Sequence, residues 1–392
     1  SPDSYRDPLP SPNIPTFTKT TKIKASLKYD LTARCLALNI PENIEIIEKL
    51  FSSGAMDWHQ FTAIASNHMV LQMMYPELLQ YKLLHYLPAD LQSHLKEIYT
   101  QNTKRNEIIL SQISNVSELL QKNNITAIFL KGAGILLDDN YGDPGKRIME
   151  DIDILTHPND WMKTVKLLLS NGYKSSYTPE ISALAKRKHY PRMSVASEPA
   201  EIEIHQTAVK AQWANKLSFD LLYKNSIPST INPQILVLND SFKIIHSALH
   251  TMKEHKGFKT AHIRLREMKD VEILSKNVKP GKILHQYTWF QKEILSLLKL
   301  TESVFHLPSN VDLPSTFSSS FFLFRHKLNL NNNFILFLTL FMLRIPKKIY
   351  IHYIKVPTLA IFTKKERKRF LRKIVKASTW RRHFRSYFKV FR

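Results

Sequence analysis

The chain has 392 residues, of which 43% are hydrophobic, enough to fill one large or two ordinary domains, and this composition excludes a disordered protein. Cys35 is the only cysteine, which excludes an internal disulfide and a multi-cysteine zinc site and favours a reducing, cytoplasmic location. The formal net charge is +23, and residues 342–392 hold 17 Lys/Arg against the single acid Glu366, so polyanion binding is expected mainly in that segment.

The first part of the chain predicts a tail followed by helices. Residues 1–24 are rich in Pro and Ser and have no apolar core of the kind a signal peptide needs, so we expect a flexible N-terminal tail. Residues 25–122 are expected to form an N-terminal helical region, because apolar residues recur three and four positions apart. Pro88 and Asp90 mark the start of a helix within this region.

A strand-rich segment, residues 123–215, comes next. It begins with a short apolar run at 125–130, which predicts a buried strand, and continues with a helix at 133–140 and a second strand at 148–155. Pro158 and Asp160 then begin a helix that Gly172 closes. Further strands are expected at 173–177, 189–196 and 201–205.

Helical patterns return from Leu217, so residues 216–310 are expected to form a helical region that completes the domain. Residues 311–392 are expected to form a basic, aromatic C-terminal helical extension. Its longest hydrophobic run, residues 334–343, is about half the length that a membrane-spanning helix needs. The fold class predicted from this order is α+β, a mixed sheet with N- and C-terminal helical regions on either side.

The second strand contains a pair of acids with the spacing of a metal site. Side chains two apart on a strand point to the same face, so Asp151 and Asp153 project together, while Glu150 faces the opposite way. Two carboxylates this close stay ionised only with a cation between them, and oxygen ligands favour Mg²⁺. On the strand at 201–205, Glu203 shares a face with His205 and could supply a third carboxylate.

The turn before the first acidic strand suits a phosphate. Four of the eight glycines of the chain fall between residues 132 and 145, and Gly132 lies two residues after the end of the first strand. Small residues let backbone amides approach a phosphate, and Lys131 and Arg147 could neutralise it. The alternative is that these two cations are ion partners of nearby acids, namely Asp138, Asp139 or Asp143.

The motif order L-K-G-A-G, Y-G-D-P-G-K-R, D-I-D-I-L and E-I-E-I-H resembles the DNA polymerase β-like nucleotidyltransferase superfamily. The likeness is to its uncharacterised branch of nucleotidyltransferase family proteins and extends over about residues 48–275. It implies a palm of mixed sheet and helices at residues 123–215, in which Asp151, Asp153 and Glu203 are both the catalytic residues and the metal ligands. It makes Gly132 the glycine of the phosphate turn. The third acid is commonly Asp in the superfamily, whereas this chain has the longer Glu203.

The function that we predict is transfer of a nucleoside monophosphate from an NTP to a hydroxyl acceptor, with Mg²⁺ or Mn²⁺ as cofactor and release of pyrophosphate. The acceptor is left open among a small molecule, RNA and protein. Lys131, Gly132 and Arg147 are expected to contact the nucleotide. The alternative is a binding protein without catalysis that contacts RNA or an anionic membrane surface through residues 342–392, peripheral to the membrane. A solvated helical cap is the other interpretation of that segment.

Histidines and one further acid allow additional interpretations. His205 is predicted to orient other groups rather than to transfer protons. The spacing of His246, His250 and His255 invites a zinc site, but Ser247 stands where the zinc-protease motif needs Glu, so we favour structural or substrate-lining roles. Asp270 is predicted to anchor Arg266, one turn away, and the alternative is that it reaches the cleft.

Overall fold

The structure, a computed structural model, describes residues 25–331 except 178, 180–183, 185–186 and 310–311. It divides into two compact units, one of Ser1–Phe258 with Ile263–Leu323 and one of Lys259–His262 with Phe324–Arg392. The predicted tail at 1–24 and residues 332–392 of the predicted basic extension lie outside the described residues. Among the residues that are described, none of the helices combines the length and hydropathy of a membrane-spanning segment.

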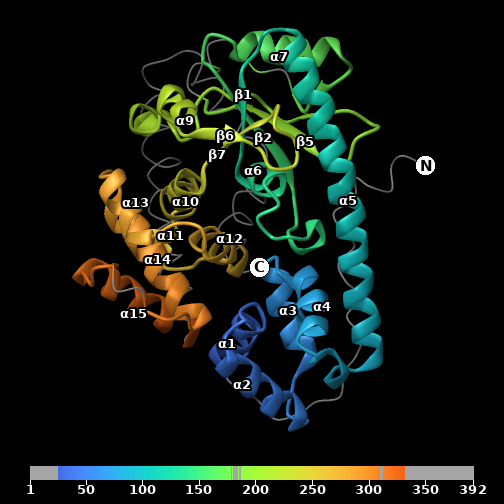
Figure 1. Ribbon diagram of the computed structural model, residues 1–392, viewed down its shortest axis with the longest axis vertical. Coiled ribbons are helices and arrows are strands. Elements are labelled where there is room, and N and C mark those ends of the chain that lie inside the picture. Colours follow the sequence, from blue (N-terminus) through green and yellow to red (C-terminus); the bar gives the residue numbers. More distant parts are fainter. Residues whose placement is uncertain (1–24, 178, 180–183, 185–186, 310–311, 332–392) are drawn as a thin grey trace, which may run out of the picture. The chain divides into compact units, whose positions relative to one another are not determined.

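Helices fill the segment before the first strand, as predicted. They are α1 (Ala25–Cys35), α2 (Pro41–Ser52), α3 (Trp58–Asn67), α4 (Leu71–Gln80), a short 3₁₀ turn (Leu84–Tyr86) and the 34-residue α5 (Ala89–Lys122). Helix α5 starts directly after Pro88, which confirms the predicted helix start; the fixed φ of proline suits this position. Figure 1 shows α5 running from the N-terminal helices along one side of the sheet.

A seven-stranded mixed sheet forms the centre of the first unit (Figure 1). Its strands, in the order β3-β4-β5-β2-β1-β7-β6, are β3 (Lys174–Ser175), β4 (Met193–Ser194), β5 (Glu201–His205), β2 (Asp151–Thr156), β1 (Ala127–Leu130), β7 (Leu236–Leu238) and β6 (Ser226–Pro228). β2 runs parallel to β5 and antiparallel to β1, and β7 runs parallel to β1. The predicted α+β class is confirmed.

Strands β6 and β7 correct one prediction. The pattern from Leu217 onward was expected to be helical only, yet both strands lie there and extend the central sheet. Each strand is three residues long, too short for the alternation of apolar and polar residues that distinguishes a strand from a helix. What holds β7 is its parallel pairing with β1, a contact between segments more than 100 residues apart.

The other described helices follow β1 in the sequence. They are α6 (Lys131–Leu137), α7 (Trp161–Ser170), α9 (Phe219–Lys224), α10 (Asp240–Ala248), α11 (Gly257–Thr260), α12 (Leu265–Ser275), α13 (Pro280–Gln286), α14 (Gln291–Phe305) and α15 (Phe317–Asn331). Two short 3₁₀ turns (Pro144–Lys146 and Ala211–Lys216) and a π-helical turn (Leu249–Glu254) complete the described elements. Gly172 takes a left-handed φ of 89° just after α7, as predicted for a helix end.

The two faces of the sheet have opposite chemistry. One face carries the isoleucines of β2 and β5, which are buried in one core with α5 and α7. In α5 the core positions are Ile109, Ile113, Val116 and Leu120, the residues whose spacing predicts the helix. Because side chains alternate along a strand, the acids of β2 and β5 project from the other face. The buried apolar face thus fixes the register, and the register fixes where the acids lie.

Within the second unit, the described residues form a few contacts between α15 and the segment at 259–262. His326 Nδ1 lies 3.0 Å from the Ala261 carbonyl oxygen, and Asn329 donates a hydrogen bond of 2.8 Å to the Thr260 carbonyl. The side chain of His326 is buried, and this burial lowers its pKa to about 4. The ring is therefore neutral at physiological pH.

Candidate active site

The parallel pairing of β2 with β5 places the predicted acids side by side. Asp151 is opposite Glu201, and Asp153 is opposite Glu203. The predicted condition, that the two acidic strands are neighbours with their acids on one face, is confirmed. The catalytic and metal-binding roles of these acids stay predictions.

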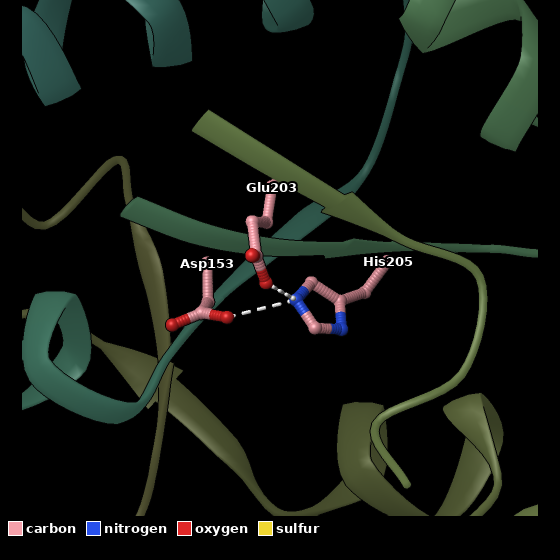
Figure 2. A group of neighbouring side chains, drawn as sticks. All are labelled: Asp153, Glu203 and His205. Atoms are coloured by element: carbon pink, nitrogen blue, oxygen red, sulfur yellow. Dashed lines mark hydrogen bonds and ion pairs between the residues drawn. The ribbon is translucent and has the colours of Figure 1, made fainter. Parts of the chain in front are cut away.

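A buried group of three side chains lies at the centre of this face. The Nε2 atom of His205 is 2.8 Å from Asp153 Oδ1 and 3.3 Å from Glu203 Oε2 (Figure 2). One ligand atom from each of the three residues lies within 4.8 Å of the others, so together they could hold a metal ion. Nε2 donates to the carboxylates, and Nδ1 is buried without a hydrogen-bond partner. The donor set contains two carboxylates and one imidazole.

Lys131 neutralises the most buried of these acids. Its ammonium lies 2.5 Å from Asp153 Oδ1, and the Asp153 side chain is only 1% exposed. Burial alone would lower the pKa of Lys131, but the charges of Asp153 and Asp151 raise it, so the ammonium stays protonated. The same pair acts in reverse on Asp153: Lys131 and His205 outweigh burial and hold the pKa of this carboxyl well below its usual range.

The backbone of Lys131 is strained. Its φ is 48°, in the left-handed region that side chains with a Cβ rarely adopt. Lys131 is also the first residue of α6, directly after β1, so this conformation turns the chain from strand to helix. Such strain costs on the order of 1 kcal/mol and is common at functional sites.

Arg192 holds the remaining carboxylates of the face. Its guanidinium donates to Asp151 Oδ2 at 2.9 Å, to Glu201 Oε2 at 3.2 Å and to Glu203 Oε1 at 2.8 Å. The arginine side chain is 46% exposed, so this cation lies at the solvent side of the acids. Arg192 was not among the predicted site residues.

The carboxylates respond differently to their surroundings. Burial and the nearby charge of Asp153 raise the pKa of Asp151 to about 6. For Glu203, burial is outweighed by the hydrogen bond from His205, and the pKa falls to about 2. Four carboxylates of this face meet one ammonium and one guanidinium, an excess of two negative charges before the imidazole of His205 is counted. A divalent cation would match that charge.

Helix α5 fixes the loop that leads into β2. Asn102 donates to the Gly145 carbonyl at 2.8 Å, and Asn106 donates to the Arg147 carbonyl at 2.7 Å. Both asparagines are buried in the middle of the helix. A Cβ on Gly145 would lie 2.4 Å from a ring carbon of Tyr99 on the same helix, so only glycine allows this close approach.

Arg147 is held by a different acid from those predicted. It donates from Nε to Asp270 Oδ1 at 2.9 Å and from Nη2 to Asp270 Oδ2 at 2.8 Å, and its side chain is 8% exposed. Tyr141 donates to the same carboxylate at 2.7 Å. The interpretation that Asp270 anchors Arg266 is therefore wrong, and so is the pairing of Arg147 with Asp138, Asp139 or Asp143. No local pattern links residues 123 positions apart.

Gly132 lies beneath Arg147. A Cβ at Gly132 would collide with Arg147 Nη1 and would lie 2.6 Å from Met149 Sδ. Glycine at this position therefore makes room for the buried guanidinium. The predicted contact of Gly132 with a phosphate stays a prediction, and α6, of which it is the second residue, is seven residues long.

A cavity of about 60 Å³ adjoins Lys131. It lies between the turn from β1 to α6 and the helices α10 and α12. Its charged lining residues, other than histidines, are Lys131, Arg147, Lys243, Arg266, Glu267 and Asp270. His246 and His250 also line it, and the substrate-lining role considered for them stays a prediction. His250 is paired with Glu254 at 3.2 Å within the π-helical turn. Among the described residues, the group of potential metal ligands is Asp153, Glu203 and His205, not these histidines.

Comparison with known proteins agrees with this arrangement. The family model described as an uncharacterised nucleotidyltransferase matches residues 54–311, about two thirds of the chain. That range contains β1 to β7, α5 to α14 and every acid described above. A search of curated proteins finds no match. The chain therefore belongs to this family of uncharacterised nucleotidyltransferases.

Proposed function

We propose that the protein transfers a nucleoside monophosphate from a nucleoside triphosphate to a hydroxyl acceptor, with Mg²⁺ or Mn²⁺ bound by Asp151, Asp153 and Glu203. The observation that carries the proposal is the side-by-side placement of these carboxylates on neighbouring parallel strands. The family to which the chain belongs supports the same class of reaction.

The residues present fit a divalent cation. Asp153, Glu203 and His205 offer donor atoms within 4.8 Å of one another, and carboxylate oxygens are the ligands that Mg²⁺ and Mn²⁺ prefer. The excess of carboxylates over lysine and arginine side chains on this face supports the same conclusion. Asp151 is accessible enough to join them, with 20% of its side chain exposed. Lys131 and Arg192 each pair with one oxygen of these carboxylates, so both cations compete with a metal for the site.

In the reaction, an acceptor oxygen attacks the α-phosphorus, the bond from this phosphorus to the β-bridging oxygen breaks, and pyrophosphate leaves while the hydroxyl proton passes to solvent. The bound cation supplies positive charge for the phosphate oxygens. Asp151, Asp153 and Glu203 position it. Lys131, once it leaves Asp153, has its ammonium next to the cavity and can neutralise a phosphate oxygen.

Arg147 is proposed to act on the nucleotide indirectly. Its guanidinium already binds Asp270 through two nitrogens, and the third nitrogen is 3.3 Å from the Ile148 carbonyl oxygen. We assign it the role of holding the turn at Gly132 in place. Contact of residues 342–392 with RNA or an anionic membrane surface concerns residues outside those that the structure describes, and it stays a prediction.

The test uses the full chain, α-³²P-labelled nucleotides and a cell extract as the source of acceptor. Label should pass to an acceptor in the presence of Mg²⁺ or Mn²⁺ and disappear with EDTA. The double variant Asp151→Asn, Asp153→Asn should lose the transfer. Asp220→Asn, which removes an exposed carboxylate of α9, is the matched control and should keep it. Equal labelling by the double variant and the control would refute the assignment.

A further inference from the structure

The cavity next to Lys131 is lined by cations that differ in how well they are paired. Of the described residues, four Lys and Arg side chains line it. Lys131 is 2.5 Å from Asp153, Arg147 is 2.8 Å from Asp270, and Lys243 is bound by Asp138 and, at 3.2 Å, by Asp240. These three cations are satisfied by the protein itself.

Arg266 is the exception. Its nearest carboxylate oxygens are those of Glu150 at 3.5 Å and Glu267 at 3.7 Å, beyond the range of a good charged hydrogen bond. Its Nε atom is buried and has no hydrogen-bond partner, although the side chain is only 13% exposed. A guanidinium removed from water without close partners is unfavourable, so an arginine in this state needs an explanation.

The acids of the cavity do not supply that explanation. Asp270 is bound by Arg147 and Tyr141, as described above. Glu267 accepts a hydrogen bond of 2.9 Å from the backbone nitrogen of Arg264 at the start of α12, so one of its oxygens is already used. The fork of Arg266 is thus left facing a small cavity that Lys131 shares.

We propose that Arg266 binds the pyrophosphate end of the nucleoside triphosphate. The proposal rests on the proposed function for the identity of the anion. A guanidinium fork matches two phosphate oxygens, and binding would give its terminal nitrogens closer partners than Glu150 and Glu267. The cavity has room for a few water molecules and not for a nucleotide, so it suits the end of a phosphate chain whose nucleoside lies outside it.

A ligand-binding residue and a structural residue differ in how their replacement changes the stability of the ligand-free protein. Removing Arg266 eliminates a poorly paired, largely buried cation, so the ligand-free variant should unfold at the same temperature as the wild type or higher. Removing an arginine that holds the fold together would lower the unfolding temperature. This readout separates the two roles without any catalytic assay.

The experiment measures binding of pyrophosphate, ATP and AMP by calorimetry to the full chain and to two variants. Arg266→Gln removes the cation in the cavity. Arg264→Gln is the matched control, because it removes the same charge two residues earlier in the chain. The side chain of Arg264 is exposed, and its guanidinium contacts Met69 Sδ. Arg266→Gln should weaken pyrophosphate and ATP at least about tenfold and leave AMP unchanged, while Arg264→Gln should stay within about threefold of the wild type.

The inference is overturned if Arg266→Gln binds pyrophosphate as the wild type does, if both variants weaken it equally, or if ATP binding is unaffected. A variant that unfolds at a clearly lower temperature or fails to fold also overturns it, because Arg266 would then be structural. The nucleotide-labelling assay is independent of these results. Transfer without Arg266-dependent binding refutes this inference alone, and Arg266-dependent binding without transfer refutes the proposed function alone.

Discussion

Replacing Asp270 with Asn tests whether Arg147 supports the fold. The carboxylate of Asp270 accepts three hydrogen bonds, at 2.9 and 2.8 Å from Arg147 and at 2.7 Å from Tyr141, and the residue is 3% exposed. The substitution keeps the shape of the side chain and removes its charge. It leaves the guanidinium of Arg147, itself 8% exposed, without a counter-ion.

The expected loss of stability is large. Removing one partner of a buried ion pair costs about 3–5 kcal/mol, because the remaining charge is neither solvated nor paired. The Asn amide oxygen can still accept one of the hydrogen bonds, so we expect the lower end, about 3 kcal/mol. A domain with a total stability of about 5–15 kcal/mol would lose a substantial part of it. The double variant Arg147→Met, Asp270→Leu should recover most of that loss, since it leaves no unpaired charge.

The measurement is unfolding in urea followed by tryptophan fluorescence, with the free energy of unfolding compared between variants. Asp139→Asn serves as control, because it removes an exposed carboxylate close by in the sequence, and it should stay within about 0.5 kcal/mol of the wild type. A loss of under about 1 kcal/mol for Asp270→Asn would refute the reasoning. Arg147 would then be free to contact the nucleotide directly.

Three further outcomes are expected. Gly132→Ala should lower the free energy of unfolding by about 1–3 kcal/mol in the same urea assay, because its Cβ would overlap Arg147; no loss would contradict the packing. Burial lowers the pKa of His246 to about 4, below its unfolded value near 6.5, so the free energy of unfolding should fall by about 3 kcal/mol as the pH drops from 6.5 to 4. In His246→Gln this part of the pH dependence should be missing. An unchanged pH profile in the variant would refute the role of His246. Arg192→Ala should tighten Mn²⁺ binding roughly five- to thirtyfold by electron paramagnetic resonance, because the cation no longer competes for Asp151; weaker binding would show that Arg192 supports the metal site.

The acidic face could be predicted because the strands that carry it are strongly patterned. In β2 and β5 isoleucine alternates with acid, and burying the isoleucines leaves one position for the acids. Arg192 was within reach of the same reasoning. β4 pairs with β5 in antiparallel fashion with Met193 opposite Ile202, so Arg192 lies next to Glu203 on the acidic face. Pairing the expected strands at 189–196 and 201–205 would have found it.

Other contacts had no signal in the sequence. Arg147 meets Asp270 because α12 packs near the turn before β2, and no period or motif connects residues so far apart in the chain. The underpaired state of Arg266 depends on distances of a few tenths of an ångström, which only coordinates give. Strands β6 and β7 were missed because pairing with β1, and not their own pattern, makes them strands.

The hydrogen bonds between α5 and the loop before β2 determine which residues of the loop tolerate substitution. Asn102 and Asn106 bind carbonyl oxygens of the main chain at Pro144, Gly145 and Arg147, so the side chains of the loop take no part in these hydrogen bonds. Lys146 can therefore vary without weakening these hydrogen bonds. Loss of the side-chain amide of either asparagine would leave buried carbonyl oxygens without a donor. In the loop this contact therefore constrains Gly145, which lies against Tyr99 of α5, and not Lys146, whose ammonium pairs with Glu77 of α4.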